Sequence, residues 1–205
     1  QGQILSPQRL GLAASIGFAN VKVYRPLKVA ILSTGDELVE PGEITKPGQI
    51  YNSNRYLLDG LLKNFQFEVV DLGVIPDQLE ATQAALQKAA NLADVVITTG
   101  GASVGEEDHV KAAVESQGEL ALWKLNIKPG KPLAFGSVNG RPFFGLPGNP
   151  VSAYTTLCQF VWPALRTLSC EGEVANLNWR GKLTHDVKKS HFRREFMRGY
   201  YMQSF

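Results

Sequence analysis

Residues that could bind an anion or a metal ion gather in four turns of this sequence, and each turn follows a stretch with the apolar character of a β-strand. The turns are GDEL, GGASVGEED, KPGKP and LPGNP, at residues 35–38, 100–108, 128–132 and 146–150. In an open α/β sheet the carboxyl ends of the strands line one crevice, so turns far apart in the sequence converge on one ligand. The pattern therefore predicts a single site at one edge of a sheet.

The first two turns carry groups that suit a phosphate and a cation. GGASVG lies between an expected strand and an expected helix, where its backbone amides could cradle an anion. It matches neither GxGxxG nor the P-loop pattern, and an ordinary tight turn explains it equally well. Asp36, Glu37 and Asp108 offer the hard oxygen ligands that Mg²⁺ takes together with a phosphate. Helix capping is the alternative role for Asp108.

The third and fourth turns suggest an oxyanion site. Lys124, Lys128 and Lys131 place three cations on one expected strand face and its following loop, which the prolines of KPGKP would make rigid. A solvated lysine face is the alternative interpretation. Gly148 and the helix start after LPGNP could also receive a phosphate, although the same residues suit a plain strand-turn-helix junction.

Hydrophobic runs predict the elements that position these turns. Apolar runs without alternation indicate strands covered on both faces, and apolar residues at helical spacing indicate helices between them. We expect strands at 28–34, 67–75, 94–99, 120–128, 132–138 and 141–146, and helices at 6–18, 52–64, 79–93, 105–118 and from 149 onward. This alternation predicts an α/β fold with three layers, α/β/α, and a mostly parallel sheet with one antiparallel hairpin at an edge.

Several helices carry start and stop signals. Asp77, with Glu80 three residues later, predicts a capping box at the start of the third helix, and Asp77 could serve the site as well. Gly118 is expected at the C-terminal end of the fourth helix. Ser6 is expected to cap the first helix and Asn149 the last, which Pro163 should kink or break.

Two signals shape the chain between residues 120 and 146. Side chains alternate in LALWKLNIK, which predicts one strand with an apolar face and a polar face. The apolar face would hold Trp123, Leu125 and Ile127, and the polar face Lys124, Asn126 and Lys128. Asn139-Gly140, between two strand-like runs, predicts a hairpin with a type I′ turn.

We divide the chain of 205 residues into three parts. Residues 1–24 form a helix and linker that lead in, and residues 25–170 form the α/β domain. From residue 171 to 205, short polar and aromatic stretches suggest the start of a small β-domain. No internal repeat or segment of low complexity is apparent.

Composition argues against several classes of protein. With 21 basic and 19 acidic residues the net charge is +2, which gives no reason to expect binding to nucleic acid or a membrane. No apolar run approaches the roughly 20 residues of a membrane helix, and no signal peptide pattern is present, so we expect a cytoplasmic protein. Neither a disulfide framework nor a zinc site is indicated by the few scattered candidates, Cys158, Cys170, His109, His185 and His191.

Five motifs, taken together and in order, resemble one family. STGDEL, GQIYNSN, TTGGASVGEED, WKLNIKPGKP and GLPGNPVSA closely resemble the MoeA family of molybdopterin molybdenumtransferases, which includes the E domain of gephyrin and its plant counterpart. The resemblance runs from about Ile4 to the end of the chain. Single motifs also occur, in looser form, in the MogA/MoaB adenylyltransferases and in CinA-type proteins of the same fold. LPGNPVSA and KPGKP, with RREFMRG downstream, favour the MoeA branch.

The resemblance implies a MogA/MoaB-like molybdopterin-binding domain that inserts molybdate into adenylylated molybdopterin and releases AMP, with Mg²⁺ as cofactor. Carried onto this sequence, the implied catalytic residues are Glu37, Asp77, Asp108, Lys124 and Lys128, and the implied metal ligands are Asp36, Glu37 and Asp108. The implied binding residues for the substrates are Thr34, Gly35, Asp36, Gly100, Gly101, Ser103, Gly105, Lys131, Pro147, Gly148, Asn149, Pro150, Arg193 and Arg194. The lysines would hold the oxyanion or the pterin phosphate, and an arginine would approach from the small β-domain.

The resemblance also implies a homodimer for the full-length protein and a MogA-like partner. Members of the family carry an elongated N-terminal half, almost all of which is missing here, and their C-terminal β-domain is longer. We therefore expect this chain to hold the central ligand-binding domain rather than the complete enzyme. Two other functions stay open: a MogA-like molybdopterin adenylyltransferase, and a non-catalytic scaffold like gephyrin, which an exposed aromatic groove on the β-domain would support.

Overall fold

The computed structural model describes residues 2–100, 109–171, 181–187 and 192–200. The helices are α1 (Pro7–Ser15), α2 (Ser53–Asn64), α3 (Leu79–Leu92), α4 (His109–Gln117), α5 (Pro150–Thr156) and α6 (Trp162–Leu168), with a π-helical turn, η1 (Leu157–Val161), between the last two. The strands are β1 (Lys28–Thr34), β2 (Leu38–Val39), β3 (Ile50–Tyr51), β4 (Glu68–Ile75), β5 (Val95–Thr99), β6 (Gly118–Trp123), β7 (Ile127–Lys128), β8 (Ala134–Val138), β9 (Arg141–Leu146) and β10 (Arg194–Glu195).

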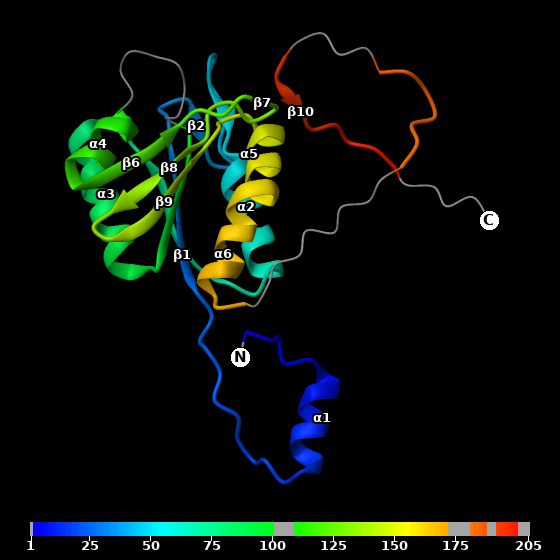
Figure 1. Ribbon diagram of the computed structural model, residues 1–205. Helices are drawn as coiled ribbons and strands as arrows, with labels where there is room; N and C mark the ends of the chain where they lie inside the picture. The colour runs from blue at the N-terminus through cyan, green and yellow to red at the C-terminus, as the bar shows by residue number, and fades with distance from the viewer. Residues whose placement is uncertain (1, 101–108, 172–180, 188–191, 201–205) are drawn as a thin grey trace.

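Six strands form the central sheet, in the order β4-β1-β5-β9-β8-β6. The first four run parallel, whereas β8 lies antiparallel to both of its neighbours. Helices α3 and α4 cover one face, and α2, α5 and α6 cover the other (Figure 1). The expected fold of three layers, with a mostly parallel sheet and an antiparallel edge, is confirmed.

Strand β1 lies between two hydrophobic cores. Val29 and Ile31 belong to the cluster beneath α2, α5 and α6, and Ala30 and Leu32 belong to the cluster beneath α3 and α4. Because both faces of this strand are covered, polar residues find no place on either of them. Burial on both sides thus accounts for the unbroken apolar run that predicts the strand.

The predicted start signals of α1 and α5 are confirmed. Ser6 Oγ accepts a hydrogen bond from the N–H of Arg9 at 3.4 Å, and Asn149 Oδ1 accepts one from the N–H of Ser152 at 3.1 Å. Pro163 lies in the first turn of α6, directly after η1. A proline lacks the N–H that continues the ladder, and the α-helix is interrupted where the sequence predicts a break.

The antiparallel edge of the sheet follows the predictions only in part. Asn139 and Gly140 have φ values of 48° and 74°, as a type I′ turn requires, so the predicted hairpin is confirmed. The single alternating strand expected at 120–128 is wrong. Lys124 takes a φ of 86°, which turns the chain out of β6, and only Ile127 and Lys128 form the separate strand β7.

Two predicted helix signals are also wrong. The N-cap of α3 is Gln78 rather than Asp77, and no side chain caps this helix. The backbone N–H of Asp77 donates instead to Asp36 Oδ1 at 3.1 Å, which draws this residue into a turn contact. Gly118 does not end α4 in a left-handed cap but opens β6, where a Cβ would strike the carbonyl of Ser137 on β8. Close approach of two strands therefore explains this glycine.

The described segment before β1, which contains α1, projects from the layered domain in Figure 1. No residue of α1 is buried. Among the described residues after α6, β10 is the one strand, and it pairs in parallel with β7. The division at residues 24 and 170 stays a prediction. None of the described helices is long and apolar enough to cross a membrane.

Candidate functional site

The carboxyl ends of the parallel strands lie level with one another. Thr34, the last residue of β1, pairs with Ile75 at the end of β4, and Ser33 pairs with Thr99 at the end of β5. Thr99 pairs in turn with Leu146, the last residue of β9. The turns that follow these strands therefore begin at one edge of the sheet, which is the crevice that the topology predicts.

Glycines allow three of these turns to touch. Gly100 has a φ of 84° and lies against the carbonyl of Thr34, which a Cβ at position 100 would strike. A Cβ on Gly148 would come 3.9 Å from the Cα of Gly100. Gly35, with a φ of 140°, leaves its side-chain space to the carboxylate of Glu37. The turns after β1, β5 and β9 thus pack against one another through backbone.

Buried side-chain oxygens without a partner gather in this half of the domain. Among the described residues they belong to Thr34 at the end of β1, Thr98 near the end of β5, Asn54 in the first turn of α2, and Thr82 in the first turn of α3. The amide nitrogen of Asn54 donates to the carbonyl of Gly148 at 2.8 Å, while its oxygen stays unpaired. Buried polar groups normally find partners, so the oxygens of Thr34 and Asn54, which lie beside the crevice, indicate a place for a ligand or water.

The acidic turn after β1, residues 35–37, is tied to two neighbouring segments. Asp36 Oδ1 accepts from the N–H of Asp77, which follows β4. The carbonyl of Glu37 accepts from the N–H of Ile50 in β3 at 2.9 Å. The side chains of Asp36, Glu37 and Asp77 are all exposed, so three predicted carboxylates stand at the open edge of the sheet.

The turn after β9 leads directly into α5. Pro147 is buried, whereas Gly148, Asn149 and Pro150 are exposed, with Asn149 as the cap of the helix. The hydrogen bond from the side-chain amide of Asn54 to the carbonyl of Gly148 fixes this turn to α2. These predicted binding residues therefore lie at the same edge as the acidic turn.

The lysine loop, residues 124–133, connects β6 to β8 at this edge as well. Trp123 at the end of β6 pairs with Ala134, which pairs with Gly145 near the end of β9. The N–H of Lys124 closes the loop by donating to the carbonyl of Leu133 at 2.9 Å. The loop thus starts and ends beside the turn that follows β9.

The three lysines do not share a strand face. Lys124 is half-buried at the break after β6, Lys131 is exposed within the loop, and Lys128 belongs to β7. Lys128 Nζ lies 3.2 Å from Glu195 Oε1, a carboxylate of β10. The loop at this edge therefore carries three cations, and one of them already has an anionic partner.

The predicted arginines lie on the C-terminal segment. Arg194 is part of β10, where its N–H donates to the carbonyl of Asn126 at 3.1 Å, and Arg193 is half-buried just before it. A cavity of about 390 Å³ opens in this segment, lined by Val187, Phe192, Arg194, Glu195 and Met197. Pairing with β7 places Arg194 next to the lysine loop.

The remaining predicted residues lie outside the described part of the chain, namely Gly101, Ser103, Gly105 and Asp108. Within the described part, no three His, Cys, Asp or Glu side chains are grouped as metal ligands. Magnesium commonly takes one or two protein carboxylates and fills its other positions with water and substrate phosphate. The adjacent carboxylates of Asp36 and Glu37 fit that mode of binding.

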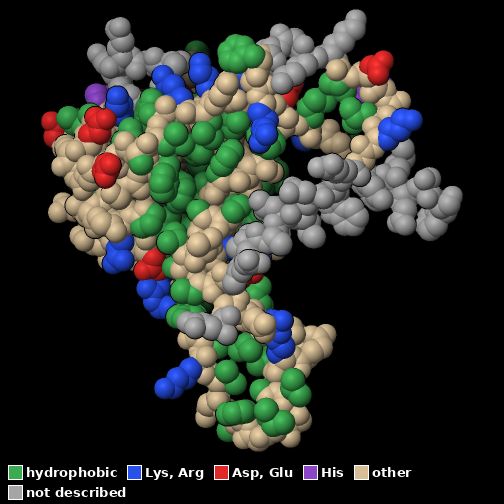
Figure 2. Space-filling model, viewed as in Figure 1, with side chains coloured by type: hydrophobic (Ala, Val, Ile, Leu, Met, Phe, Trp, Pro, Cys, Tyr) green, Lys and Arg blue, Asp and Glu red, His purple; other side chains and the backbone are tan. Residues whose placement is uncertain are grey.

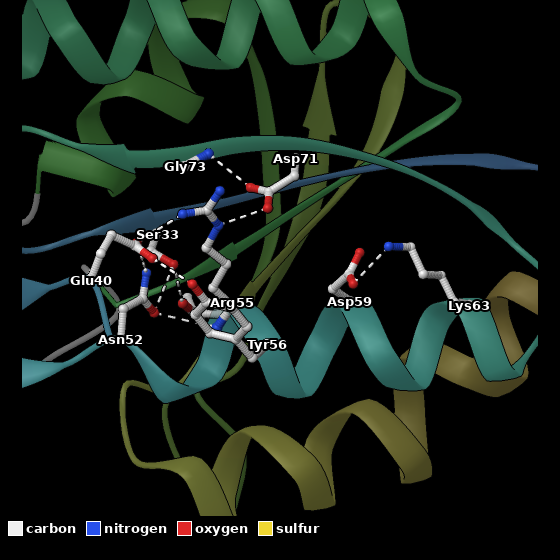
Figure 3. A network of polar contacts seen from close by, with 10 residues as sticks. Ser33, Glu40, Asn52, Arg55, Tyr56, Asp59, Lys63, Asp71 and Gly73 are labelled. Atoms are coloured by element: carbon white, nitrogen blue, oxygen red, sulfur yellow. Dashed lines mark hydrogen bonds and ion pairs between the residues drawn. The ribbon is translucent and has the colours of Figure 1, made fainter. Parts of the chain in front are cut away.

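A polar network beside the crevice was missed by the sequence predictions (Figure 3). The guanidinium of Arg55 pairs with Glu40 at 2.8 Å and with Asp71 at 2.7 Å. Glu40 also accepts from the hydroxyl of Tyr56 at 2.9 Å and from the amide of Asn52 at 3.4 Å. The segment YNSNRY contains three of these side chains, yet nothing in its spacing indicates which carboxylates they meet.

The contacts within this network shift the pKa values of Arg55, Glu40 and Tyr56. The hydrogen bond to Asp71 raises the pKa of Arg55 against the opposing effect of partial burial. Burial works against ionisation of Glu40, but the donors Arg55 and Tyr56 outweigh it and lower the pKa of that carboxyl. The carboxylate in turn raises the pKa of Tyr56. All three groups keep their usual charge state near neutral pH.

A family model described as "Probable molybdopterin binding domain" matches residues 30–167. The match begins in β1 and reaches α6, so it contains the whole central sheet and the turns of the crevice.

Individual relatives agree with this match. The chain is 46% identical to a molybdopterin molybdenumtransferase from Haemophilus influenzae, over 98% of this chain and 50% of that protein. It is 38% identical to a MoeA protein from Pyrococcus horikoshii, with a TM-score of 0.73 over 83% of this chain and 42% of that one. A MoaB enzyme from Thermus thermophilus shares the fold, with 20% identity and a TM-score of 0.54.

The chain spans about half the length of the Haemophilus protein that it matches. The fold agrees with that of the solved relatives. The chain belongs to the family of molybdopterin-binding domains, in the branch of the MoeA-type proteins.

Proposed function

We propose that this chain provides the substrate crevice of a molybdopterin molybdenumtransferase, which inserts molybdate into adenylylated molybdopterin and releases AMP. One observation carries the proposal: the turns after β1, β5 and β9 touch through glycine at a sheet edge where buried oxygens of Thr34 and Asn54 lack partners. The Haemophilus relative, named for this activity, is similar over nearly the whole chain.

The glycine turns would hold the pterin nucleotide. The missing Cβ at Gly100 lets the turns after β1 and β5 pack together, and Gly148, where only the Cα of Gly100 lies within 4 Å of an added Cβ, leaves room for ligand atoms beside the turn after β9. The hydroxyl of Thr34 and the amide oxygen of Asn54 would receive the polar groups that they lack in the free protein. These contacts orient the substrate by its uncharged groups.

Asp36 and Glu37 would hold Mg²⁺ together with phosphate oxygens of the substrate, with Asp108 as a further ligand. The cation would supply charge stabilisation at the phosphoanhydride that is cleaved when AMP leaves. The protein contributes the position of the two carboxylates, fixed by the contacts of Asp36 with Asp77 and of Glu37 with Ile50. Asp77 adds a third negative charge to the same opening.

The lysine loop would bind molybdate or the pterin phosphate. Lys124 lies at the start of the loop and Lys131 near its end, and the charge of Lys128 is offset in part by Glu195. Arg194 reaches this region on β10. Cations on one side and carboxylates with Mg²⁺ on the other suit a substrate with several anionic groups.

Product analysis tests the proposal. The chain, and the same chain extended to the length of its relatives, would be incubated with adenylylated molybdopterin, molybdate and Mg²⁺. We expect AMP and molybdenum cofactor, with Glu37→Gln reducing both and Glu43→Gln, an exposed carboxylate nearby, leaving them unchanged. Formation of pyrophosphate from ATP and molybdopterin, without AMP release from the adenylylated substrate, would assign the adenylyltransferase reaction instead.

A second function, a non-catalytic anchor for a peptide, is supported by the cavity in the C-terminal segment. Its wall includes Phe192 and Met197, whose exposed fractions are 85% and 59%. A cavity lined by both apolar and charged side chains, among them Arg194 and Glu195, suits an extended peptide with an aromatic or aliphatic side chain. Peptide binding that Phe192→Ala abolishes, in a chain with no turnover at any length, would favour this function.

Homodimerisation, a MogA-like partner and a cytoplasmic location complete the proposal. Hydrophobic side chains gather on the projecting N-terminal segment in Figure 2, and Leu12, Ile16 and Phe18 are each more than 60% exposed. Such a surface supports contact with another protein surface. Cys158 and Cys170 are free thiols, in line with a reducing compartment. Sedimentation of the full-length protein, alone and with a MogA-like protein, tests the assembly.

A further inference from the structure

Arg55 joins two carboxylates from different parts of the chain. It lies in the first turn of α2, and its Nε donates to Asp71 Oδ2 of β4 at 2.7 Å. Its Nη1 lies 2.8 Å from Glu40 Oε1, just after β2. The three side chains are each less than a third exposed, so solvent screens these pairs only in part.

The sheet end of this contact is firmly held. Asp71 Oδ1 accepts from the N–H of Gly73 at 2.9 Å while Oδ2 receives Arg55. The pairing of β4 with β1 shifts register at this point, and Gly73 takes a φ of 76°. A bulge of this kind re-aims a side chain. Here it presents Asp71 to Arg55 from a strand in the central sheet.

The other end holds the segment that carries the acidic turn of residues 35–37. Glu40 follows β2, and β2 follows that turn directly. Strand β2 pairs with β3, and the N–H of Asn52 donates to the carbonyl of Val39 at 2.9 Å. The side chain of Asn52 reaches Ser33 of β1 and Glu40, both at 3.4 Å, and caps the N–H of Arg55 at 3.3 Å. The small sheet β2-β3 is thus joined to α2 through Asn52, and Glu40 adds a second connection through its ion pair with Arg55.

We infer that Arg55 is a positioning residue, whose bridge from Asp71 to Glu40 holds the acidic turn of Asp36 and Glu37 in place. The inference rests on the proposed function only for the use of that turn in binding Mg²⁺. Arg55 itself stays behind the turn and bonds to other side chains, so it acts through Glu40. No role in contacting substrate is assigned to it.

The same helix offers a matched comparison. One and two turns beyond Arg55, Asp59 and Lys63 form an ion pair at 2.8 Å within α2 (Figure 3). This pair connects no other element, so its loss should leave the acidic turn untouched. Arg55→Met and Lys63→Met both remove one cation from α2. The first breaks contacts between three segments, and the second breaks a contact within the helix.

Amide hydrogen exchange of the ligand-free chain tests the inference directly. The probes are Leu38, Ile50 and Asn52, whose N–H groups donate to the carbonyls of Gly35, Glu37 and Val39. In Arg55→Met we expect these amides to exchange faster by about tenfold or more relative to amides of β5, because charged hydrogen bonds oppose the local opening. Lys63→Met should leave the ratio unchanged.

Further variants separate positioning from general destabilisation. Glu40→Gln, which keeps the shape and removes the charge, should reproduce the local effect, and Asp71→Asn should do so more weakly. Equal acceleration of the three probes and of β5 in Arg55→Met would overturn the inference, as would an equal response to Lys63→Met. Unchanged exchange in Glu40→Gln would also overturn it.

Mg²⁺ titration links the result to function. If the extended chain releases AMP, Arg55→Met should raise the Mg²⁺ concentration for half-maximal rate by about tenfold, with a smaller change in the KM for the pterin substrate. A changed KM with an unchanged requirement for Mg²⁺ would overturn the assignment to the acidic turn. Failure of AMP release in all chains would count against the proposed function alone, because the exchange experiment uses no ligand.

Discussion

An arginine bound to carboxylate lies toward each end of β1, Arg25 before the strand and Arg55 in α2, and the two contacts are built differently. At the start of the strand, Arg25 donates to both oxygens of Asp94 at 2.6 and 2.7 Å, and Asp94 also accepts the N–H of Lys28 at 2.9 Å. At the other end, Arg55 divides its donors between two carboxylates on different segments, and Thr34 Oγ1 nearby has no partner among the described residues.

The difference separates a structural end of the sheet from a functional one. A bidentate pair whose carboxylate is filled by protein donors closes the edge and leaves nothing for a ligand. At the opposite edge, glycines at positive φ and buried oxygens without partners each cost folding free energy. The same oxygens stay available to bind a ligand. Removing a polar side chain should therefore lower stability at the closed end and weaken binding at the open end, whereas the glycines of the open end contribute to stability through backbone packing.

The largest effect on stability is expected where the turns after β1 and β5 pack together through their backbones. Gly100→Ala would place a methyl against the carbonyl of Thr34 at a φ of 84°. We expect a loss of about 3 kcal/mol in the free energy of unfolding, measured in urea, because both overlap and backbone strain contribute.

Gly140→Ala is the control for strain alone. Gly140 has a φ of 74° but nothing within 4 Å of its added Cβ, so we expect only about 1 kcal/mol. Equal losses for the two variants would mean that the turns after β1 and β5 are not in contact.

The next effect concerns the closed end. Hydrogen bonds from Arg25, and then from Lys28, hold the pKa of Asp94 at about 2, against the opposing influence of burial. Asp94→Asn should lower the free energy of unfolding by about 1–2 kcal/mol at pH 7, a figure reduced for solvent screening at the exposed arginine.

The pH dependence has a definite sign. Because the folded pKa of Asp94 is depressed, its contribution is complete above about pH 4 and is lost as the pH falls through about 2. Urea titrations of the chain and of Asp94→Asn should therefore converge in that acidic range. A difference that persists unchanged at pH 2 would show that the charge of Asp94 is not what stabilises the edge.

A smaller effect, of opposite sign for stability and binding, sharpens the contrast between the two ends. Thr34→Val keeps the shape and removes an unpaired hydroxyl, so we expect a gain of about 0.5–1 kcal/mol in stability and weaker binding of the pterin nucleotide. Thr98→Val removes a similar hydroxyl from inside β5 and should raise the melting temperature without affecting binding. A loss of stability in Thr34→Val would mean that this hydroxyl is already satisfied.

The smallest effect on stability is expected in the lysine loop. Lys124→Ala and Lys131→Ala should change the free energy of unfolding by no more than ~0.5 kcal/mol and weaken binding of molybdate or pterin phosphate. Lys128→Ala should weaken it less at low salt than the other two, because Glu195 offsets part of its charge. Calorimetric titration with molybdate compares the three; unchanged affinities together with a large fall in melting temperature would make the lysines structural.

The sequence predicts the crevice better than its details. Apolar runs such as residues 28–34 need burial on both faces, which indicates a parallel sheet covered by helices. In such a sheet the carboxyl ends of the strands lie along one edge. The caps at Ser6 and Asn149 and the turn at Asn139-Gly140 are local chemistry, which short segments determine.

What the sequence misses depends on distant partners. Asp77 contacts Asp36 through its backbone N–H instead of capping α3. Around Lys124, a backbone hydrogen bond to Leu133 interrupts the alternating strand. The partners of Arg55 lie on β4 and beyond β2, so no spacing within α2 reveals them. Tertiary contacts of this kind override local patterns, and they decide which side chains face the site.

The position of β1 between β4 and β5 has a consequence for folding during synthesis. Both partners of β1 follow it in the chain, and β9, which closes the crevice, follows all three. Parallel pairing of distant segments delays contact formation relative to local hairpins. The acidic turn leaves the ribosome before β4, β5 and β9 are synthesised. The nascent chain therefore exposes the apolar run of β1 until these strands can pair. Chaperone binding and aggregation during expression should accordingly be sensitive to residues 28–34.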